Sequence, residues 1–380
     1  MSYSDVVGHR SMVFDGTRNA AYTRALKQVV TSDTTVMDLG AGLGLHGLIA
    51  ARLGAEKVYL VEPTAAIEVA RKVAADNQLT QVECFQARAE ELKLDTRVDV
   101  IVSVFTGNFL LNEDLLPSLF HARDHFLAPG GRMIPDRGRM EVVPVSAPAY
   151  YQKHIDAWGS FPESCAEQGF PELDYSAMRA YAANYMSYDS AKHMAAEQLA
   201  APVALMELDF MTATKAECDS ELDVVIEQDG FCHGWVGWFQ MRLGDEWLST
   251  SGEPGPTHWS PVFLPLEEPI EVKAGELLKF ALKRAEYGEW TWATTHAGQR
   301  QRQSTFLSQP LTPVHMLKAS ENYQPALSER GQAAKWLLST MDGASNLADL
   351  ARQLREEFPE LFTSDAQALK QVRELAERFS

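Results

Sequence analysis

The chain has 380 residues, of which 46% are hydrophobic and 23% are charged, and its formal net charge is −18. This length allows two or three domains, and the composition is that of an ordinary globular protein. The acidic balance argues against broad binding to nucleic acid or to an anionic membrane, because both need a cationic surface. An acidic surface would attract arginine-rich, lysine-rich or amine substrates, or it serves solubility alone.

The cysteines and the N-terminus indicate a cellular location. Four cysteines, Cys84, Cys165, Cys218 and Cys232, are too far apart for a CxxC redox or metal motif. The N-terminal stretch MSYSDVVGHRSMVF lacks the apolar core of a signal peptide. No run approaches the roughly 20 apolar residues of a membrane span. We therefore expect a cytoplasmic protein with no membrane partner and no metal.

Strands and helices alternate along residues 34–145, after a helix expected from about Thr17. The strands are TTVMDLG, KVYLVEP, VECFQAR and VDVIVSVF, and the helices include LGLHGLIAARLG and AAIEVARKVAADNQL. A further helix, LLPSLFHARDHFLAPGG, is expected to close at its Pro-Gly-Gly. This alternation predicts an α/β domain over residues 1–145, with a Rossmann-like, doubly wound parallel sheet.

The pattern changes in the second half of the chain. Residues 205–310 read as short strands separated by turn residues, which predicts an antiparallel, β-barrel-like substrate domain over residues 146–312. Residues 150–200 are aromatic and partly helical, as in an arm or a connector. Three amphipathic helices follow Pro313 and predict a small helical domain over residues 313–380, of winged-helix type.

A glycine-rich turn ends the first predicted strand, in VMDLGAGLGLHGL. Gly40 and Gly42 let the backbone turn tightly and come close to a ligand. The spacing is GxGxG rather than the GxGxxG of phosphate-binding turns. Asp38 precedes the first glycine by two residues, which suits a ligand that carries an ammonium group.

Two more acids follow the next strands. Glu62 ends the second strand, where an acid accepts hydrogen bonds from ribose hydroxyls. Glu90 follows the third strand, where an adenine ring would lie near Ala89. Together these residues indicate S-adenosylmethionine (SAM), with its amino-acid part at Asp38 and the glycines. A nicotinamide dinucleotide is the surviving alternative.

With these residues, the chain resembles the protein arginine methyltransferases over about residues 8–310. HRSMVFDGTRNAAY is similar to the helix that folds over SAM in that family, RDHFLAPGGRMIPDR to the end of its sheet, and PTHWSPVFL to its Thr-His-Trp loop. The resemblance implies that Met12 touches the sulfonium and that Arg18 pairs with the SAM carboxylate. It also implies a homodimer, formed through an arm for which segment 160–185 is the candidate.

The Thr-His-Trp loop contains His258 and Trp259. In the family the loop histidine pairs with an acid of the N-terminal helix, which is Asp15 here. Such a pair can hold an imidazole in one tautomer and carry off a proton. The alternative is a structural link between two domains, and both can hold together.

The chain departs from the family in SVFTGNFLLNEDLL. The family binds arginine with two glutamates in this loop; the second matches Glu113, and the first falls on Val104. The sulfonium of SAM and the guanidinium of arginine are both cations, and about 4 Å apart they repel by roughly 4 kcal/mol at an effective dielectric of 20. One carboxylate fits better a nucleophile that is neutral when it attacks. Val104 and Phe105 would add an apolar wall and Asn108 a neutral hydrogen bond, and Tyr151 would lie at the acceptor entrance.

We therefore expect a SAM-dependent N-methyltransferase that acts on a side-chain nitrogen of a peptide, protein or amino acid, with an acceptor other than ordinary arginine. The alternatives are a tailoring methyltransferase for a free amino acid such as arginine or histidine, and a non-catalytic SAM-fold protein that binds peptides. The C-terminal helices are similar to winged-helix modules that bind leader peptides, or they form a cap or a dimer contact. The segment LADLARQLREEF has three acids and two arginines, which argues against DNA binding.

Overall fold

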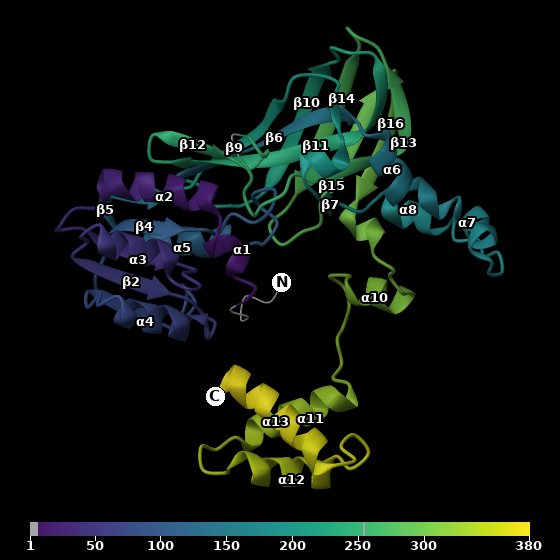
Figure 1. Ribbon diagram of the computed structural model, residues 1–380. Helices are drawn as coiled ribbons and strands as arrows, with labels where there is room; N and C mark the ends of the chain where they lie inside the picture. Colours follow the sequence, from purple (N-terminus) through teal and green to yellow (C-terminus); the bar gives the residue numbers. More distant parts are fainter. Residues whose placement is uncertain (1–6, 254) are drawn as a thin grey trace. The chain divides into compact units, whose positions relative to one another are not determined.

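The structure, a computed structural model, describes residues 7–253 and 255–380. The chain divides into two compact units, Met1–Pro310 and Leu311–Ser380. Figure 1 shows the strands of the first unit and the helices of the second.

The first unit begins with a five-stranded parallel sheet in the order β3-β2-β1-β4-β5. Its strands are β1 (Thr35–Leu39), β2 (Lys57–Val61), β3 (Val82–Phe85), β4 (Val98–Ser103) and β5 (Leu127–Ile134). The helices are α1 (Arg10–Val13), α2 (Gly16–Val29), α3 (Leu45–Arg52), α4 (Ala66–Asp76) and α5 (Leu116–Phe126). This arrangement confirms the predicted Rossmann-like sheet.

The strands are parallel because their apolar runs can be covered on both faces by the crossover helices. Val36, Leu60 and Val102 are fully buried in the sheet. The carboxyl ends of β1, β2 and β4 lie at one edge, where open α/β sheets bind ligands. That edge therefore brings together the glycine turn, Glu62 and Val104.

The predicted end of the last helix of this sheet is wrong. Helix α5 ends at Phe126, and Pro129, Gly130 and Gly131 belong to β5. Leu127 is already extended, and β5 is the edge strand of the sheet. A proline is tolerated there because an edge strand has a free hydrogen-bonding side.

The rest of the first unit is largely antiparallel. One sheet has the order β7-β13-β11-β6-β8, with β12 on β11 and β9 on β6, and another the order β10-β14-β15-β16. The strands are β6 (Arg137–Ser146), β7 (Ser187–Tyr188), β8 (Glu197–Gln198), β9 (Val203–Asp209), β10 (Cys218–Val225), β11 (Gly230–Leu243), β12 (Glu246–Ser249), β13 (Val262–Val272), β14 (Leu277–Arg284), β15 (Thr291–His296) and β16 (Gln299–Ser304). The antiparallel prediction is confirmed, but the described strands form two sheets rather than one closed barrel. Because β6 pairs with β11, the antiparallel part begins before the boundary expected at residue 145.

Residues 150–200 are helical in several short pieces, as expected. The pieces are α6 (Pro148–His154), η1 (Asp156–Trp158), α7 (Phe161–Gln168), α8 (Met178–Ala182) and α9 (Ala191–Met194). A further short helix, η2 (Thr305–Ser308), follows β16. Figure 1 shows α6 and α8 beside the antiparallel sheets and α7 extending outward beyond α8.

The second unit is helical. It contains α10 (Pro313–Lys318), α11 (Glu329–Thr340), α12 (Leu347–Glu357) and α13 (Asp365–Phe379), and the last three are the amphipathic helices predicted from the sequence. Side chains of Ser328, Asn346 and Ser364 cap them, as their residue types predict. No strand occurs between Leu311 and Ser380, all of which the structure describes, so the predicted wing is wrong. Among the residues the structure describes, no helix is both long enough and apolar enough to cross a membrane.

The core of the second unit provides a matched pair of positions on α11. Leu337 is 0% exposed and packs in the unit's core, whereas Leu338 is 38% exposed. Leu337→Ala should lower the free energy of unfolding of this unit by roughly 2–5 kcal/mol, because it leaves a cavity. Leu338→Ala should change it by less than about 1 kcal/mol. Hydrogen exchange of α11–α13 amides measures both, and equal protection in the two variants would contradict the described core.

Candidate functional site

A cleft of about 280 Å³ lies at the carboxyl edge of the parallel sheet. It is lined from α1 and α2, the glycine turn, the ends of β2 and β4, and the loop before β13. Its lining includes the residues predicted to hold the cofactor, here called the cofactor end, which are Met12, Arg18, Asp38, Gly40, Gly42 and Glu62. It also includes those predicted to face the acceptor, here called the acceptor end, which are Val104, Phe105, Asn108, Glu113, His258 and Trp259. The structure thus brings together twelve of the residues predicted from the sequence.

The glycine turn adopts a conformation that other residues avoid. Gly40 and Gly42 have φ values of +68° and +53°, in the left-handed region. A Cβ on Gly40 would lie 2.1 Å from Cε1 of Phe105, so the Phe105 ring packs directly on the turn. A side chain at Gly40 would push this ring into the cleft.

Two carboxylates at this end are oriented by backbone amides. Asp38 accepts a hydrogen bond from the Gly47 N–H (2.7 Å), and Glu62 accepts from the N–H groups of Gly42 (3.0 Å) and Thr64 (2.9 Å). The pKa of Asp38 is raised to about 7, chiefly because the carboxyl is buried, and also by the nearby Glu62 carboxylate. The Gly47 N–H and the Arg18 guanidinium act in the opposite direction. The anionic form of Asp38 therefore needs a cationic partner, such as an ammonium group.

Arg18 is a buried cation at the same end of the cleft. Its Nη2 donates to the carbonyl oxygen of Met12 (2.6 Å), and its Nε donates to Asn19 Oδ1 (3.0 Å). These bonds tie α1 to α2 and hold the guanidinium beside the cleft. A carboxylate ligand would supply the counter-charge for Arg18, just as an ammonium would for Asp38, so the two residues suit an amino-acid group.

Asp15 and His258 form the predicted pair. Asp15 Oδ2 accepts from Nδ1 of His258 (2.9 Å) and from its backbone N–H (2.8 Å), and Oδ1 accepts from the Arg18 N–H (2.8 Å). Burial raises the pKa of Asp15, but these hydrogen bonds outweigh it and lower the pKa overall. Burial lowers the pKa of His258 despite the opposing effect of Asp15. The imidazole is therefore neutral at pH 7, with its proton on Nδ1 and its basic atom at Nε2.

The acceptor end of the cleft is less acidic than the cofactor end. Of the described residues that line it, Glu113 is the one with a carboxylate, and Val104 contributes an apolar side chain. The side chain of Glu113 lies against Gly107, where a Cβ would be 2.6 Å from its Cγ. Asn108 Oδ1 accepts from the Ser260 N–H (3.3 Å), and the Trp259 ring lies 4.1 Å from that of His258.

The loop that carries Glu113 is held through the two neighbours of Glu113 by residues of the β10-β14-β15-β16 sheet and the turn before β15. Asn112 Oδ1 accepts from Trp290 Nε1 (3.1 Å), and Asp114 forms an ion pair with the buried Arg284 (2.7 Å). Phe109, Leu110 and Asp114 have positive φ values although none is glycine. Such conformations persist only where surrounding contacts enforce them, and they are common at functional sites.

Three predicted residues lie away from this cleft. Tyr151 is buried, and its hydroxyl donates to the carbonyl oxygen of Glu267 (2.7 Å), so it anchors α6 to β13 and is not at the acceptor entrance. Ala89 is in the hydrophobic core, and Glu90 accepts from Ser118 Oγ (2.5 Å). Neither lines the cleft, because the chain after β3 turns toward α5.

The structure also shows cleft residues that the sequence analysis missed, among them His9, His46 and Thr106. His46 is buried, stacks on Tyr22 with 4.3 Å between ring centroids, and has a pKa well below the usual value because of burial. Its position two residues after Gly44, in LGLHGL, was the available signal. Among the described residues, no group of three or more His, Cys, Asp or Glu side chains could hold a metal.

Known proteins share this architecture. Residues 36–131 match a methyltransferase domain, and residues 136–289 match the arginine methyltransferase oligomerization subdomain. Protein arginine N-methyltransferase 6 of Xenopus tropicalis is 30% identical over 283 residues, which cover 71% of this chain and 81% of that protein. Protein arginine N-methyltransferase 1 of Schizosaccharomyces pombe is 28% identical over 288 residues, covering 73% of this chain and 71% of that protein.

A solved structure gives the same result. The Trypanosoma brucei PRMT1 enzyme–prozyme heterotetrameric complex with AdoHcy has a TM-score of 0.71 and 25% identity, covering 80% of this chain and 99% of that one. AdoHcy is the demethylated form of SAM, and the cofactor end of the cleft has the charges that SAM requires. The chain therefore belongs to the protein arginine methyltransferase family and is a SAM-dependent methyltransferase.

Proposed function

We propose that this enzyme methylates a side-chain nitrogen that is neutral when it attacks, in a peptide, a protein or an amino acid, rather than the guanidinium of ordinary arginine. The observation that carries this proposal is the composition of the acceptor end, where Val104 is apolar and Glu113 supplies the carboxylate. Candidate acceptors are an imidazole, an amine or an amide nitrogen.

We assign the cofactor end of the cleft to specific contacts. Asp38 would pair with the SAM ammonium, Arg18 with its carboxylate, and Glu62 with its ribose hydroxyls. Gly40 and Gly42 give the backbone its close approach, and Met12 would lie at the sulfonium. When bound, SAM supplies a methyl group on a cationic sulfur.

The charge of the acceptor decides how many carboxylates the site needs. A guanidinium stays protonated in proteins, so it would be a second cation beside the sulfonium. The repulsion is roughly 4 kcal/mol at 4 Å and a dielectric of 20. A pair of carboxylates offsets it through bidentate hydrogen bonds, whereas Glu113 alone offsets part of it. A neutral nitrogen avoids this repulsion.

The chain's own residues would then position the acceptor and take its proton. Asn108 can hydrogen-bond a neutral group, and Val104 and Phe105 form an apolar wall. An acceptor that carries N–H gives up a proton when its new N–C bond forms. Glu113 and the neutral His258, with Nε2 as its basic atom, are the two bases at this end. Most of the rate enhancement would come from orientation.

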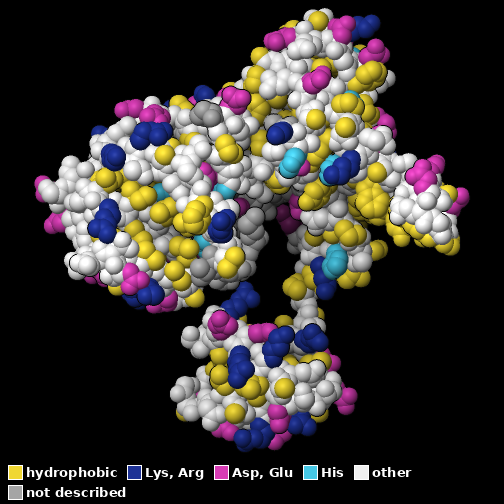
Figure 2. Space-filling view, viewed as in Figure 1, with side chains coloured by type: hydrophobic (Ala, Val, Ile, Leu, Met, Phe, Trp, Pro, Cys, Tyr) yellow, Lys and Arg dark blue, Asp and Glu magenta, His cyan; other side chains and the backbone are white. Residues whose placement is uncertain are grey.

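We also propose a homodimer. Segment 160–185 includes α7 and α8, and it exposes the apolar side chains of Phe170, Leu173 and Tyr175. Figure 2 shows hydrophobic side chains gathered on the face where Figure 1 draws these helices. The match of residues 136–289 to an oligomerization subdomain supports this arm.

The four cysteines are unpaired thiols, which suits the expected reducing cytoplasm.

The pKa of Asp38 makes SAM affinity depend on pH. The carboxyl is protonated below about pH 7, and a neutral Asp38 cannot pair with the ammonium. The dissociation constant for SAM should therefore rise roughly tenfold from pH 8 to pH 6, by linkage. Asp38→Asn should bind SAM more weakly and with a flat profile over this range. Isothermal titration calorimetry measures both, and a flat wild-type profile would remove Asp38 from its proposed role.

The missing carboxylate can be restored. Val104→Glu should increase methyl transfer to an arginine peptide by about tenfold or more, because a charge-assisted hydrogen bond contributes roughly 1.5–3 kcal/mol. Val104→Gln, of the same size but neutral, should give a much smaller gain. The assay is mass spectrometry of paired peptides that contain arginine, histidine or lysine. Efficient dimethylation of the arginine peptide by the wild type would refute the proposed acceptor class.

A single charged substitution in segment 160–185 tests whether this segment is the dimer arm. Leu173→Asp should convert the dimer to a monomer in sedimentation velocity, because it buries a carboxylate in an apolar contact. Leu277→Asp, at a similarly exposed leucine on β14, should leave the dimer intact. A wild-type protein that sediments as a monomer at micromolar concentration would exclude the proposed assembly.

A further inference from the structure

A second cavity lies in the first unit, beside β7. Its volume is about 320 Å³, and its walls come from α6, η1, α8, β7 and β13. Tyr150, His154, Trp158, Tyr181, Tyr185 and Phe263 line it.

The walls of this cavity are fixed by contacts of their own. The Tyr150 hydroxyl bonds to Ser187 Oγ (3.1 Å), and its ring packs edge-on against Phe263 at 5.4 Å between centroids. Arg179 on α8 pairs with Asp156 of η1 (3.1 Å), and a hydrogen bond to the Glu267 carbonyl oxygen (2.9 Å) ties α8 to β13. The cavity is therefore built into the fold rather than left between loose helices.

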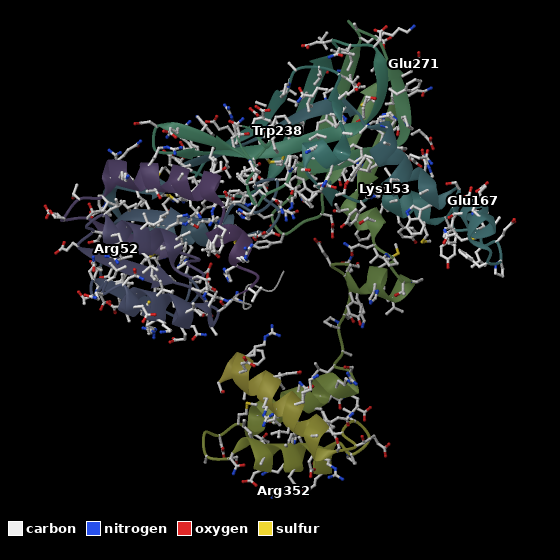
Figure 3. The ribbon with its side chains drawn as sticks, viewed as in Figure 1. Arg52, Lys153, Glu167, Trp238, Glu271 and Arg352 are labelled. Carbon is white, nitrogen blue, oxygen red and sulfur yellow. The ribbon has the colours of Figure 1, made fainter. Side chains whose placement is uncertain are left out.

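The lining of the cavity is aromatic and uncharged. No described residue with a permanent charge lines it, and burial and the nearby Lys153 lower the pKa of His154, so its imidazole is neutral at pH 7. Asp189 acts electrostatically on both Tyr150 and His154, whereas Lys153, labelled on α6 in Figure 3, acts on His154. Asp189 is itself paired with the exposed His193 (2.9 Å). The faces of Tyr and Trp rings attract cations.

We propose that this cavity binds a cationic side chain, a guanidinium or an ammonium, of a peptide that carries the acceptor. In the single chain Trp158 is 39%, Tyr181 37% and Tyr185 60% exposed. Tyr181 and Tyr185 also belong to the proposed dimer arm, so the cation site requires a dimer contact that leaves their rings open. The net charge of −18 favours the approach of a cationic peptide. Binding of the cation stands on the cavity alone, and its use as a substrate exosite rests on the proposed function.

Strand β13 explains how one peptide could reach both places. Ser187 lines the aromatic cavity, and β7 pairs with Val262 and Phe263 at the start of β13. The Thr-His-Trp loop comes just before these residues, and its His258 and Trp259 line the main cleft. A peptide that passes the start of β13 would therefore lie near both cavities.

The test measures binding without SAM and without transfer. Three pentapeptides, Gly-Gly-X-Gly-Gly with X as arginine, citrulline or leucine, are titrated by calorimetry into the full chain. The arginine peptide should bind at least fivefold more tightly than the other two, since citrulline keeps the shape without the charge. Equal binding of the three would overturn a cation site, and tighter binding of leucine would identify an apolar pocket instead.

Substitutions at Tyr185 locate the site. Tyr185→Leu should weaken binding of the arginine peptide about fivefold, and Tyr185→Phe should retain it, because the ring rather than the hydroxyl attracts the cation. Phe231→Ala, at a 53% exposed aromatic residue outside both cavities, is the control and should change nothing. Equal losses in the Leu and Phe variants would refute the cation–π contact. A loss in Glu113→Gln would place the peptide in the main cleft and overturn the proposal.

Failure here and failure of the proposed function give different results. An exosite that binds arginine while the wild type dimethylates arginine peptides would refute only the acceptor class. Transfer to histidine or lysine peptides with no preference for a distal arginine would refute only the exosite.

Discussion

The site depends on one carboxylate, that of Asp15. It caps α2 by accepting from the Arg18 N–H, and its other oxygen accepts from both the backbone and the ring of His258. These contacts join the N-terminal helices, which cover the cofactor end, to the loop before β13, which closes the acceptor end. Because all three donors converge on a buried acid, the helices and the loop are tied together and the imidazole keeps its proton on Nδ1. The structural link and the proposed chemical role would thus be the same interaction.

The charged residues of the cleft are concentrated at the cofactor end. On the proposed assignment, Asp38 and Arg18 at the cofactor end oppose the charges of an amino-acid group, and Glu62 accepts hydrogen bonds from ribose hydroxyls. The pKa of Asp38 of about 7 reflects how incompletely its charge is compensated by the protein alone. At the acceptor end the lining is apolar or neutral apart from Glu113. The sheets hold that residue through its neighbours Asn112 and Asp114, so its position is set by the fold although the loop is strained. A single well-placed carboxylate suits a neutral nucleophile that must lose a proton.

Sequence patterns predicted the parts of the molecule that local rules govern. A few neighbouring residues are enough to predict the alternating strands and helices, the glycine turn and the helix caps. The acids at the ends of β1 and β2 were predicted in the same way. Tyr151 shows where this reasoning stops, since only the phase of α6 decides that Tyr150 faces a cavity and Tyr151 the core. The positive φ values at Phe109 and Leu110 depend on distant contacts and left no glycine as a signal. The wing was predicted from the pattern of leucines in three helices, and three helices can carry that pattern without the strands of a wing.

The proposed roles of the two cavities separate two tasks that one pair of glutamates would otherwise combine. A carboxylate pair at the acceptor both recognises a cation and offsets its repulsion from a sulfonium, so recognition and chemistry require the same charge. In the proposed site Glu113 is the carboxylate at the acceptor end, and the aromatic cavity would recognise the cation of a peptide. The attacking nitrogen would then be neutral while the peptide as a whole stays cationic and is attracted by an acidic protein. A single carboxylate at the acceptor end is compatible with a preference for basic peptides, because affinity and reactivity would be supplied by different surfaces.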